Sequence, residues 1–209
     1  PVQSGSDDVL KRMARGYRAE LFERLVSKFR AAFRDTTLAT DVIVGFPGET
    51  EDDFEMTVGL LERTRPDVVN ISRYGPRPGT PASRWKSPNP ATVKRRSRLI
   101  SELVKEISRR GNEAYVGDEL TVLALERGPK GYQGRTDFYR PVALVGPDVE
   151  LGSFYDVVIE EARPTYLVGR VLAKREVKPL EVTSTVTRSG SSRRLATGRD
   201  GIPRRRAAP

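Results

Sequence analysis

The sequence predicts an α/β protein that continues into a small all-β domain and a disordered basic tail. Up to about residue 110, β-branched runs alternate with stretches of helical apolar spacing. Short β-type runs separated by glycine and proline then follow as far as Leu172. Beyond Leu172 large apolar residues almost disappear, so the tail cannot offset the entropy of ordering and is expected to be disordered.

Two helices are expected first. An acidic cap sequence at residues 6–8 starts a short helix that Gly16 ends. A longer helix is expected at residues 18–34, where apolar residues recur at helical spacing. These residues, expected to form one buried face, are Leu21, Phe22, Leu25, Val26, Phe29 and Phe33.

Two strands with a helix between them come next. Residues 38–44 form a mostly β-branched run, the composition of a strand covered on both faces. A cap at residues 50–53 starts the helix. The second strand is expected at 67–74, where Pro76 and Pro78 prevent its continuation. This order implies parallel strands with crossover helices, as in an open α/β sheet or a barrel.

A third helix, from about residue 89 to 110, leads into the all-β part. Five short β runs follow, at residues 120–125, 131–136, 141–145, 155–159 and 166–172. Short strands with glycine and proline turns are typical of a small antiparallel barrel.

Composition excludes several kinds of site. The 209 residues include no cysteine and no histidine, so disulfides, thiolate-bound clusters, zinc sites and serine–histidine triads cannot form within the chain. No apolar run reaches the roughly 18 residues that a membrane span needs, and residues 1–6 lack the pattern of an export signal. We therefore expect a cytoplasmic protein without a membrane partner.

The positive charge is concentrated at the carboxyl end. The net charge is +9, and the residues from Lys174 onward carry ten Lys and Arg against three acids. Affinity for RNA would therefore come from a local patch together with the tail, where residues 204–206 add attraction without sequence information. The basic run at 94–98 is expected to be a solvated helix face.

Three short strings carry candidate chemistry. In the first, residues 41–50 (DVIVGFPGET), glycines follow a buried strand where ligands bind in α/β folds. Gly45 and Gly48 would let the backbone approach a ligand, and Phe46 could flank an adenine. An ordinary strand-to-helix turn explains the same residues without a ligand.

The other two strings lie at residues 76–81 and 1–7. Three prolines hold Arg77 in a rigid loop, where its planar donors could meet a carboxylate or phosphate. A plain loop with a solvated arginine is the alternative. A plain helix cap explains residues 4–7 of the last string without a ligand.

Together, and in this order, the three strings resemble the radical SAM methylthiotransferases that modify tRNA. The form of residues 70–82 is most similar to the archaeal and eukaryotic branch, which acts on threonylcarbamoyladenosine next to the anticodon. The resemblance implies that residues 41–50 line an S-adenosylmethionine site. The implied cofactor-binding residues are Gln3, Ser4, Gly45, Phe46, Pro47, Gly48, Glu49 and Arg77.

The all-β part resembles the TRAM domain that ends these enzymes and binds tRNA. Basic residues interleaved with aromatics suit phosphates and base stacking. The candidate RNA contacts are Arg127, Lys130, Tyr132, Arg135, Tyr139 and Arg140. A solvated turn with core tyrosines explains them equally well.

The resemblance implies three parts: residues 1–112 as the carboxyl-terminal portion of a radical SAM, TIM-like barrel, 113–173 as a TRAM-like β barrel, and 174–209 as the tail. Complete family enzymes use S-adenosylmethionine and 4Fe-4S clusters, but no cluster is possible in this chain. We therefore assign no catalytic and no metal-binding residue. The strand edge left by the absent strands is expected to favour aggregation.

The implied function is methylthiolation of N6-threonylcarbamoyladenosine in tRNA by an enzyme of which this chain carries only the carboxyl-terminal part. The alternative is a noncatalytic tRNA- or RNA-binding protein derived from such an enzyme. Three explanations of the missing cysteines stay open: a split gene whose cluster-binding half is a separate chain, a fragment, or a relic that only binds RNA.

Overall fold

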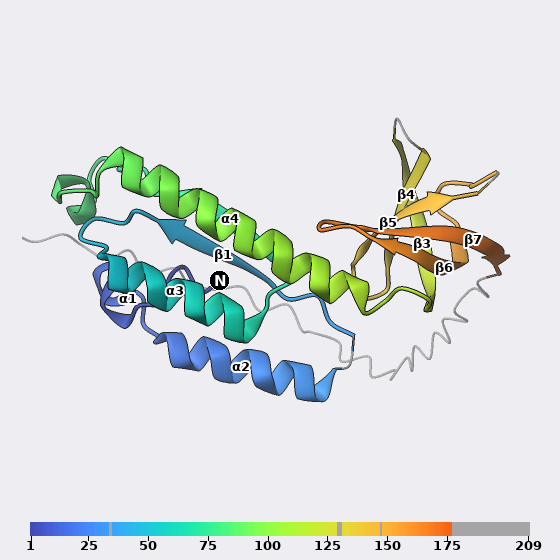
Figure 1. Ribbon diagram of the computed structural model, residues 1–209, viewed down its shortest axis with the longest axis horizontal. Helices are drawn as coiled ribbons and strands as arrows, with labels where there is room; N and C mark the ends of the chain where they lie inside the picture. Colours follow the sequence, from blue (N-terminus) through green and yellow to red (C-terminus); the bar gives the residue numbers. More distant parts are fainter. Residues whose placement is uncertain (34, 129–130, 147, 177–209) are drawn as a thin grey trace, which may run out of the picture. The chain divides into compact units, whose positions relative to one another are not determined.

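A computed structural model describes residues 1–33, 35–128, 131–146 and 148–176 (Figure 1). The first part of the chain follows the expected order of helices and strands. Its elements are α1 (Asp7–Arg12), α2 (Ala19–Ala32), β1 (Ala39–Val44), α3 (Glu51–Thr64), β2 (Val68–Arg73), the short 3-10 helix η1 (Pro81–Arg84) and α4 (Pro90–Glu113).

The strands β1 and β2 pair in parallel, from Ala39 opposite Val68 to Val44 opposite Arg73. A third extended segment lies beside β1, because Gln3 forms a parallel bridge with Val42. The helices α3 and α4 run alongside β1 (Figure 1). The buried side chains between these elements are Val2, Val42, Val44, Phe54, Leu60, Leu61 and Ile100. This core aligns the carboxyl ends of three parallel segments at one edge.

Helix α2 differs from the expectation of one fully buried face. Val26 is the buried residue of this helix. The parallel row Leu21, Leu25, Phe29 and Phe33 is between 36% and 55% exposed. Helical spacing identifies an apolar side of a helix but not the partner that covers it. The helix α2 packs on α3, and this contact leaves the row largely uncovered. The expected burial of these four residues was therefore wrong.

The second part of the described chain is a five-stranded sheet. Its strands are β3 (Glu119–Gly128), β4 (Gly131–Thr136), β5 (Pro141–Val145), β6 (Phe154–Ala162) and β7 (Leu167–Arg175). Hydrogen bonds join them in the order β3-β4-β5-β7-β6 and return from β6 to β3. Inward-facing apolar residues alternate along the strands and fill the interior, among them Val122, Leu144, Val157 and Leu167.

One strand pair contradicts the expected antiparallel arrangement. The strands β5 and β7 run parallel, with Val142 opposite Leu167, whereas the other four neighbouring pairs are antiparallel. A closed ring with an odd number of strands cannot alternate in direction at every step. With five strands, at least one parallel pair is a geometric necessity, which local sequence patterns do not reveal.

The boundary of the tail also shifts. Strand β7 ends at Arg175, so Lys174 and Arg175 belong to the sheet and not to the tail to which the sequence assigned them. The remainder of the expected tail, from residue 177, lies outside the described residues, as does Lys130. None of the helices in the described part is long and apolar enough to cross a membrane.

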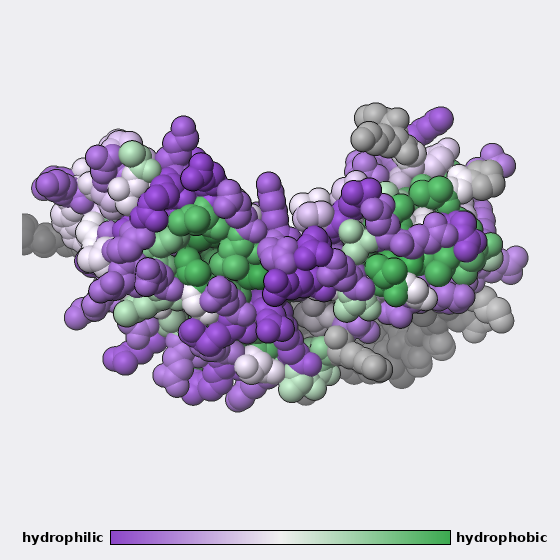
Figure 2. Space-filling view, viewed as in Figure 1, coloured by the Kyte–Doolittle hydropathy of each residue, from purple (hydrophilic) through white to green (hydrophobic). Residues whose placement is uncertain are grey.

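Apolar surface is visible in two areas of the face drawn in Figure 2. One area lies between α3 and α4, and the other lies over the five-stranded sheet. Hydrophilic residues surround both areas. The exposed row of α2 adds a further apolar surface, of the kind that usually marks a contact with another molecule or segment.

We expect the double substitution Leu25→Ser and Phe29→Ser to reduce self-association of the chain without loss of stability. Both side chains are about half exposed, so their replacement should change the free energy of unfolding by no more than about 0.5 kcal/mol. Sedimentation velocity measures the association, and urea unfolding measures the stability.

The matched control is Val26→Ser, one residue further along the same helix. Val26 is buried, so a hydroxyl there should cost about 1–3 kcal/mol. If the double variant loses as much stability as Val26→Ser, the exposed row is covered in solution and the expectation fails.

Candidate functional site

An open cavity of ≈ 760 Å³ lies at the carboxyl ends of β1 and β2. The residues that follow α1 form one wall, and the loop between Tyr74 and Trp85 forms another. Gln3, Phe46 and Arg77, which the sequence singled out separately, all line this cavity. Parallel strands bring their carboxyl ends to one edge, which is where α/β proteins bind ligands.

Three aromatic rings form one wall of the cavity. Phe46 is buried and meets Tyr74 edge to face, with ring centroids 5.1 Å apart. It meets Trp85 in the same manner at 6.2 Å. Tyr74 and Trp85, which also line the cavity, were not among the predicted site residues. The available signals were the position of Tyr74 at a strand end and the fact that Trp85 is the single tryptophan of the chain.

The cavity has a positive lining. Arg12, Arg15, Arg73 and Arg77 line it, against the single acid Asp41. Arg12 is partly neutralised by Asp53, 3.3 Å away. Exposed guanidinium groups beside aromatic rings favour an anionic ligand that also carries a flat apolar part.

The backbone at the cavity is held in an uncommon conformation. Gln3 and Ala14 have φ angles of 69° and 55°, in the left-handed region that non-glycine residues seldom occupy. Gln3 is fixed there because its N–H donates to Asp41 O and its carbonyl accepts from Ile43 N, each at 2.9 Å. Strained residues that the surroundings hold in place cluster at ligand sites.

Two buried polar atoms at the cavity lack a partner. The Tyr74 hydroxyl and Arg12 Nε have no hydrogen bond within the described part of the chain, and both residues line the cavity. Buried polar atoms in native proteins are nearly always paired with protein, water or ligand. These two atoms therefore support a polar ligand or ordered water at this place.

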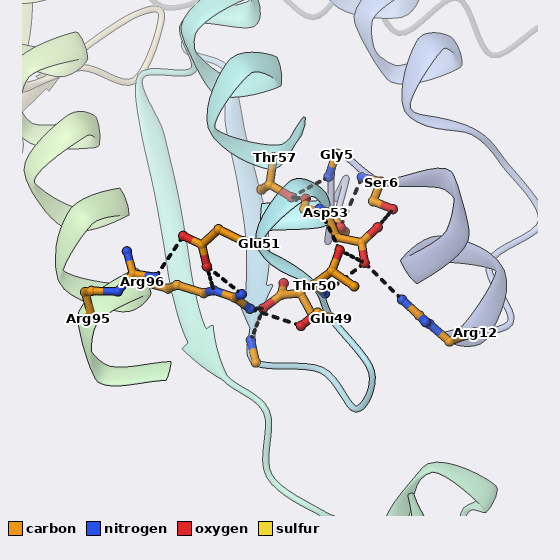
Figure 3. A network of polar contacts seen from close by, with 12 residues as sticks. Gly5, Ser6, Arg12, Glu49, Thr50, Glu51, Asp53, Thr57, Arg95 and Arg96 are labelled. Atoms are coloured by element: carbon orange, nitrogen blue, oxygen red, sulfur yellow. Dashed lines mark hydrogen bonds and ion pairs between the residues drawn. The ribbon is translucent and has the colours of Figure 1, made fainter. Parts of the chain in front are cut away.

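Next to the cavity, the turn after β1 is tied to α4 by a buried ion pair (Figure 3). Glu49 Oε2 accepts hydrogen bonds from Gly45 N and from Arg96 Nη1, each at 2.8 Å. Arg96 is only 3% exposed and also reaches Glu51 Oε2 at 2.7 Å. Burial raises the pKa of the Glu49 carboxyl above its ordinary value, although the bonds from Gly45 and Arg96 oppose that shift.

Two of the predicted cofactor-binding residues, Gly45 and Glu49, stabilise this turn. Gly45 has a φ of +79°, and a Cβ there would lie 2.6 Å from a methyl group of Val93 on α4. Gly45 thus lets α4 pack closely on the turn. Glu49 is occupied by Arg96. Gly45, Pro47, Gly48 and Glu49 shape the turn that presents Phe46, and they do not themselves line the cavity.

A second polar network links α1 to α3 (Figure 3). Asp53 accepts from Ser6 Oγ at 2.5 Å and from Thr50 N at 2.9 Å, and it forms a capping box with Thr50. Burial raises the pKa of Asp53, but these hydrogen bonds outweigh burial and hold the pKa below its ordinary value. Ser4 shares this structural role, because its buried hydroxyl lies 3.2 Å from Thr57 Oγ1.

Four of the predicted RNA contacts form two cation–aromatic pairs on the five-stranded sheet. The Arg127 guanidinium lies over the ring of Tyr132, 5.6 Å from its centroid. At the other end of β4, Arg135 lies 4.4 Å from the ring centroid of Tyr139. Tyr139 is 67% exposed. Each end of β4 therefore presents a cation beside an aromatic ring, a combination suited to phosphate and base.

Arg140 has different surroundings. It is 6% exposed, pairs with Asp67 at 2.5 Å and donates to the side chain of Asn112. Its guanidinium also lies over the ring of Tyr115. The Arg140 guanidinium is therefore bonded to Asp67 before β2 and to Asn112 of α4, and it is not available to RNA.

Comparison with known proteins adds two domain matches. Residues 1–61 match the model of the radical SAM superfamily, and residues 113–172 match the TRAM domain. The chain is similar to part of a tRNA methylthiotransferase. A probable threonylcarbamoyladenosine tRNA methylthiotransferase of Pyrococcus abyssi is 45% identical over 174 residues, which cover 83% of this chain and 40% of that protein.

Other relatives give the same picture. The corresponding protein of Archaeoglobus fulgidus is 39% identical over 84% of this chain and 41% of its own length. A tRNA-2-methylthio-N(6)-dimethylallyladenosine synthase of Dictyoglomus thermophilum is 41% identical over 85% of this chain and 41% of its own length. The chain therefore spans about 40% of the length of these relatives, and the family resemblance seen in the sequence is confirmed.

The family uses S-adenosylmethionine and 4Fe-4S clusters, and the two fit this chain differently. Within the described residues no group of three or more His, Cys, Asp or Glu could hold a metal ion, and the sequence has no cysteine. A cluster of the family type has no ligands here. The cavity, by contrast, offers an aromatic wall, arginines and unpaired polar atoms to an organic ligand.

We expect Arg96→Met to lower the free energy of unfolding by about 3–5 kcal/mol, because it leaves Glu49 buried without its counter-charge. The loss should shrink as the pH falls from 7 to 5. Without Arg96 the already raised pKa of Glu49 rises further, so the folded state binds the proton more readily than the unfolded state does and gains stability on acidification. Urea unfolding at the two pH values measures both effects.

Arg95→Met is the matched control. Arg95 pairs with the same Glu51, at 2.7 Å, but both side chains are about half exposed. Its loss should cost no more than about 1 kcal/mol at either pH. Equal losses for the two variants would show that the buried pair does not hold the turn.

Proposed function

We propose that this chain is the carboxyl-terminal part of a radical SAM tRNA methylthiotransferase. Its first part would belong to a TIM-like barrel, and its five-stranded TRAM domain would bind tRNA. The observation that carries the proposal is the convergence of Gln3, Phe46 and Arg77, from three separate strings, on one cavity. The similarity to methylthiotransferases over more than four fifths of the chain supports it.

S-adenosylmethionine suits the groups around this cavity. We assign Phe46 to the adenine and Arg77 to an anionic group of cofactor or substrate, with Gln3 as a polar contact. The bound cofactor would supply the radical chemistry of the family, which depends on a cluster held outside this chain. The residues present here would bind and orient, which is the usual contribution of the protein to a cofactor reaction.

The proposed substrate is N6-threonylcarbamoyladenosine next to the anticodon. Relatives with that name are similar to this chain, but so is a dimethylallyladenosine synthase. The form of residues 70–82 favours the first class. We further propose that a separate chain supplies the cluster-binding part and that the protein works in the cytoplasm, where its tRNA substrate is found.

The RNA surface would be formed by the two cation–aromatic pairs at the ends of β4, Arg127 with Tyr132 and Arg135 with Tyr139. The arginines would contact phosphates, which binds tRNA without reading its sequence. The exposed ring of Tyr139 would stack on an unpaired base, whereas the ring of Tyr132 packs against the apolar core and would hold Arg127 in place. Lys130 and the basic tail stay predicted RNA contacts from their charge alone, because they lie outside the described residues.

A noncatalytic tRNA-binding protein is the second candidate. The observation that favours it is that the five-stranded domain has an apolar core of its own and carries both cation–aromatic pairs. In that case the TRAM domain would function and the cavity would be inherited without use. The two candidates differ in whether the cavity supports modification once the cluster-binding part is supplied.

A chimera tests the difference. Residues 1–176 replace the matching region of the Pyrococcus abyssi relative, and nucleoside mass spectrometry measures methylthiolation of tRNA. We expect modification, and a fall of at least tenfold for Arg77→Lys, which keeps the charge but loses the planar fork. Binding of tRNA should persist in that variant. A folded chimera that binds tRNA and never modifies it would favour the noncatalytic candidate.

Salt dependence tests the RNA surface. Replacing Arg127 and Arg135 with alanine should make the plot of log affinity against log salt shallower by about 1.5, because each phosphate contact contributes about 0.7–0.9. The control replaces Arg98 and Arg170, which removes the same charge from other places. Fluorescence anisotropy with tRNA measures both slopes. If the control changes the slope equally, the contacts lie elsewhere.

A further inference from the structure

The loop between β2 and α4 ends in an exposed aromatic ring whose role the fold does not explain. Trp85 follows η1, and its backbone N–H donates to the backbone oxygen of Ala82 at 3.2 Å. The ring is 42% exposed and lines the cavity described above. A large ring left half in water at a cavity gains free energy when a ligand covers it.

The loop holds this ring in a preformed position. Thr80 Oγ1 donates to Arg77 O at 2.8 Å, and Ser83 Oγ donates to Thr80 O at 2.6 Å. Phe46 supports the ring from the buried side, with the two planes at 86°. Arg77 and Trp85 therefore stand at the two ends of one rigid segment, and little side-chain freedom is lost when a ligand binds.

The charges around the ring select the class of ligand. Arg73 and Arg77 line the same cavity and form no ion pair within the described residues. Free guanidinium groups beside an aromatic ring match a strand of unpaired nucleotides, with phosphates on the arginines and a base on the ring.

We propose that Trp85 stacks on an unpaired base of the bound tRNA at the mouth of this cavity. This inference rests on the proposed function and extends it. Phe46, which lines the same cavity and meets Trp85 edge to face, keeps its proposed role beside the adenine of the cofactor. Trp85 then positions the anticodon loop and takes no part in the chemistry.

The single tryptophan makes the proposal directly measurable. Excitation at 295 nm reports on Trp85 alone in the 209-residue chain. An RNA stem-loop with the anticodon sequence should quench this fluorescence in a saturable manner, at the same concentrations at which anisotropy of labelled RNA reports binding. Heparin, which carries charge but no bases, should leave the fluorescence unchanged.

Substitutions separate stacking from charge. Trp85→Leu should weaken RNA binding about tenfold and Trp85→Phe by less, because phenylalanine keeps a ring that can stack. The salt slope should stay unchanged in both, since no phosphate contact is lost. Met56→Ala on α3, which removes a similarly exposed apolar side chain, is the control and should bind RNA as the parent does.

The outcomes separate the stacking of Trp85 from the proposed binding of tRNA. If the stem-loop binds without quenching Trp85, the stacking proposal is overturned while tRNA binding stands. If saturating S-adenosylmethionine stops the stem-loop from quenching Trp85 while the stem-loop still binds, Trp85 belongs to the cofactor and the stacking proposal is also overturned. If neither the stem-loop nor whole tRNA binds, the proposed function itself fails.

Discussion

The buried pair of Arg96 and Glu49 is the interaction on which the arrangement of the first part depends. It joins the turn after β1 to the second turn of α4 and leaves Arg96 almost without contact to water. Burying two charges is costly, and the cost is offset only when geometry and hydrogen bonding are good. Here the Glu49 carboxylate also accepts a hydrogen bond from Gly45 N. Arg96 also donates to the Glu51 carboxylate and to the backbone oxygen of Glu49. The turn therefore has one position, and Phe46 is presented to the cavity from it.

Helix α4 carries this constraint across the described chain. Near its start, Val93 packs where Gly45 has no side chain, and near its end Asn112 accepts from Arg140 and donates to Arg163 O at 2.6 Å. Asp67, just before β2, binds both Arg140 and Leu38 N. The cavity and the TRAM domain are thus attached to the same long helix.

Much of this could be predicted from the sequence, and the failures have physical causes. Local patterns gave the order of elements, because caps and periodicity are local properties. The choice of Gln3, Phe46 and Arg77 as site residues depended on the family resemblance, because an ordinary turn, a solvated loop or a helix cap explains each local pattern equally well. They could not separate Val26, which is buried, from Leu25, which is exposed, because burial depends on the neighbouring element. Arg140 and Arg127 are alike in sequence, and only the distant Asp67 and Asn112 distinguish their surroundings. Whether the predicted site residues bind cofactor or RNA stays a prediction.

The ring order of the five strands has a consequence for how this domain is made. Strand β7 lies between β5 and β6, so the ring stays open, with two unpaired edges, until the last strand arrives. A ribosome synthesises the chain from its amino end, and these edges remain unprotected until β7 has left the exit tunnel. The pairing of Val142 with Leu167 also spans an intervening strand, and such distant contacts form slowly. Closure of the domain is therefore a late event of its biogenesis, and a chain that stops before β7 would expose strand edges prone to aggregation.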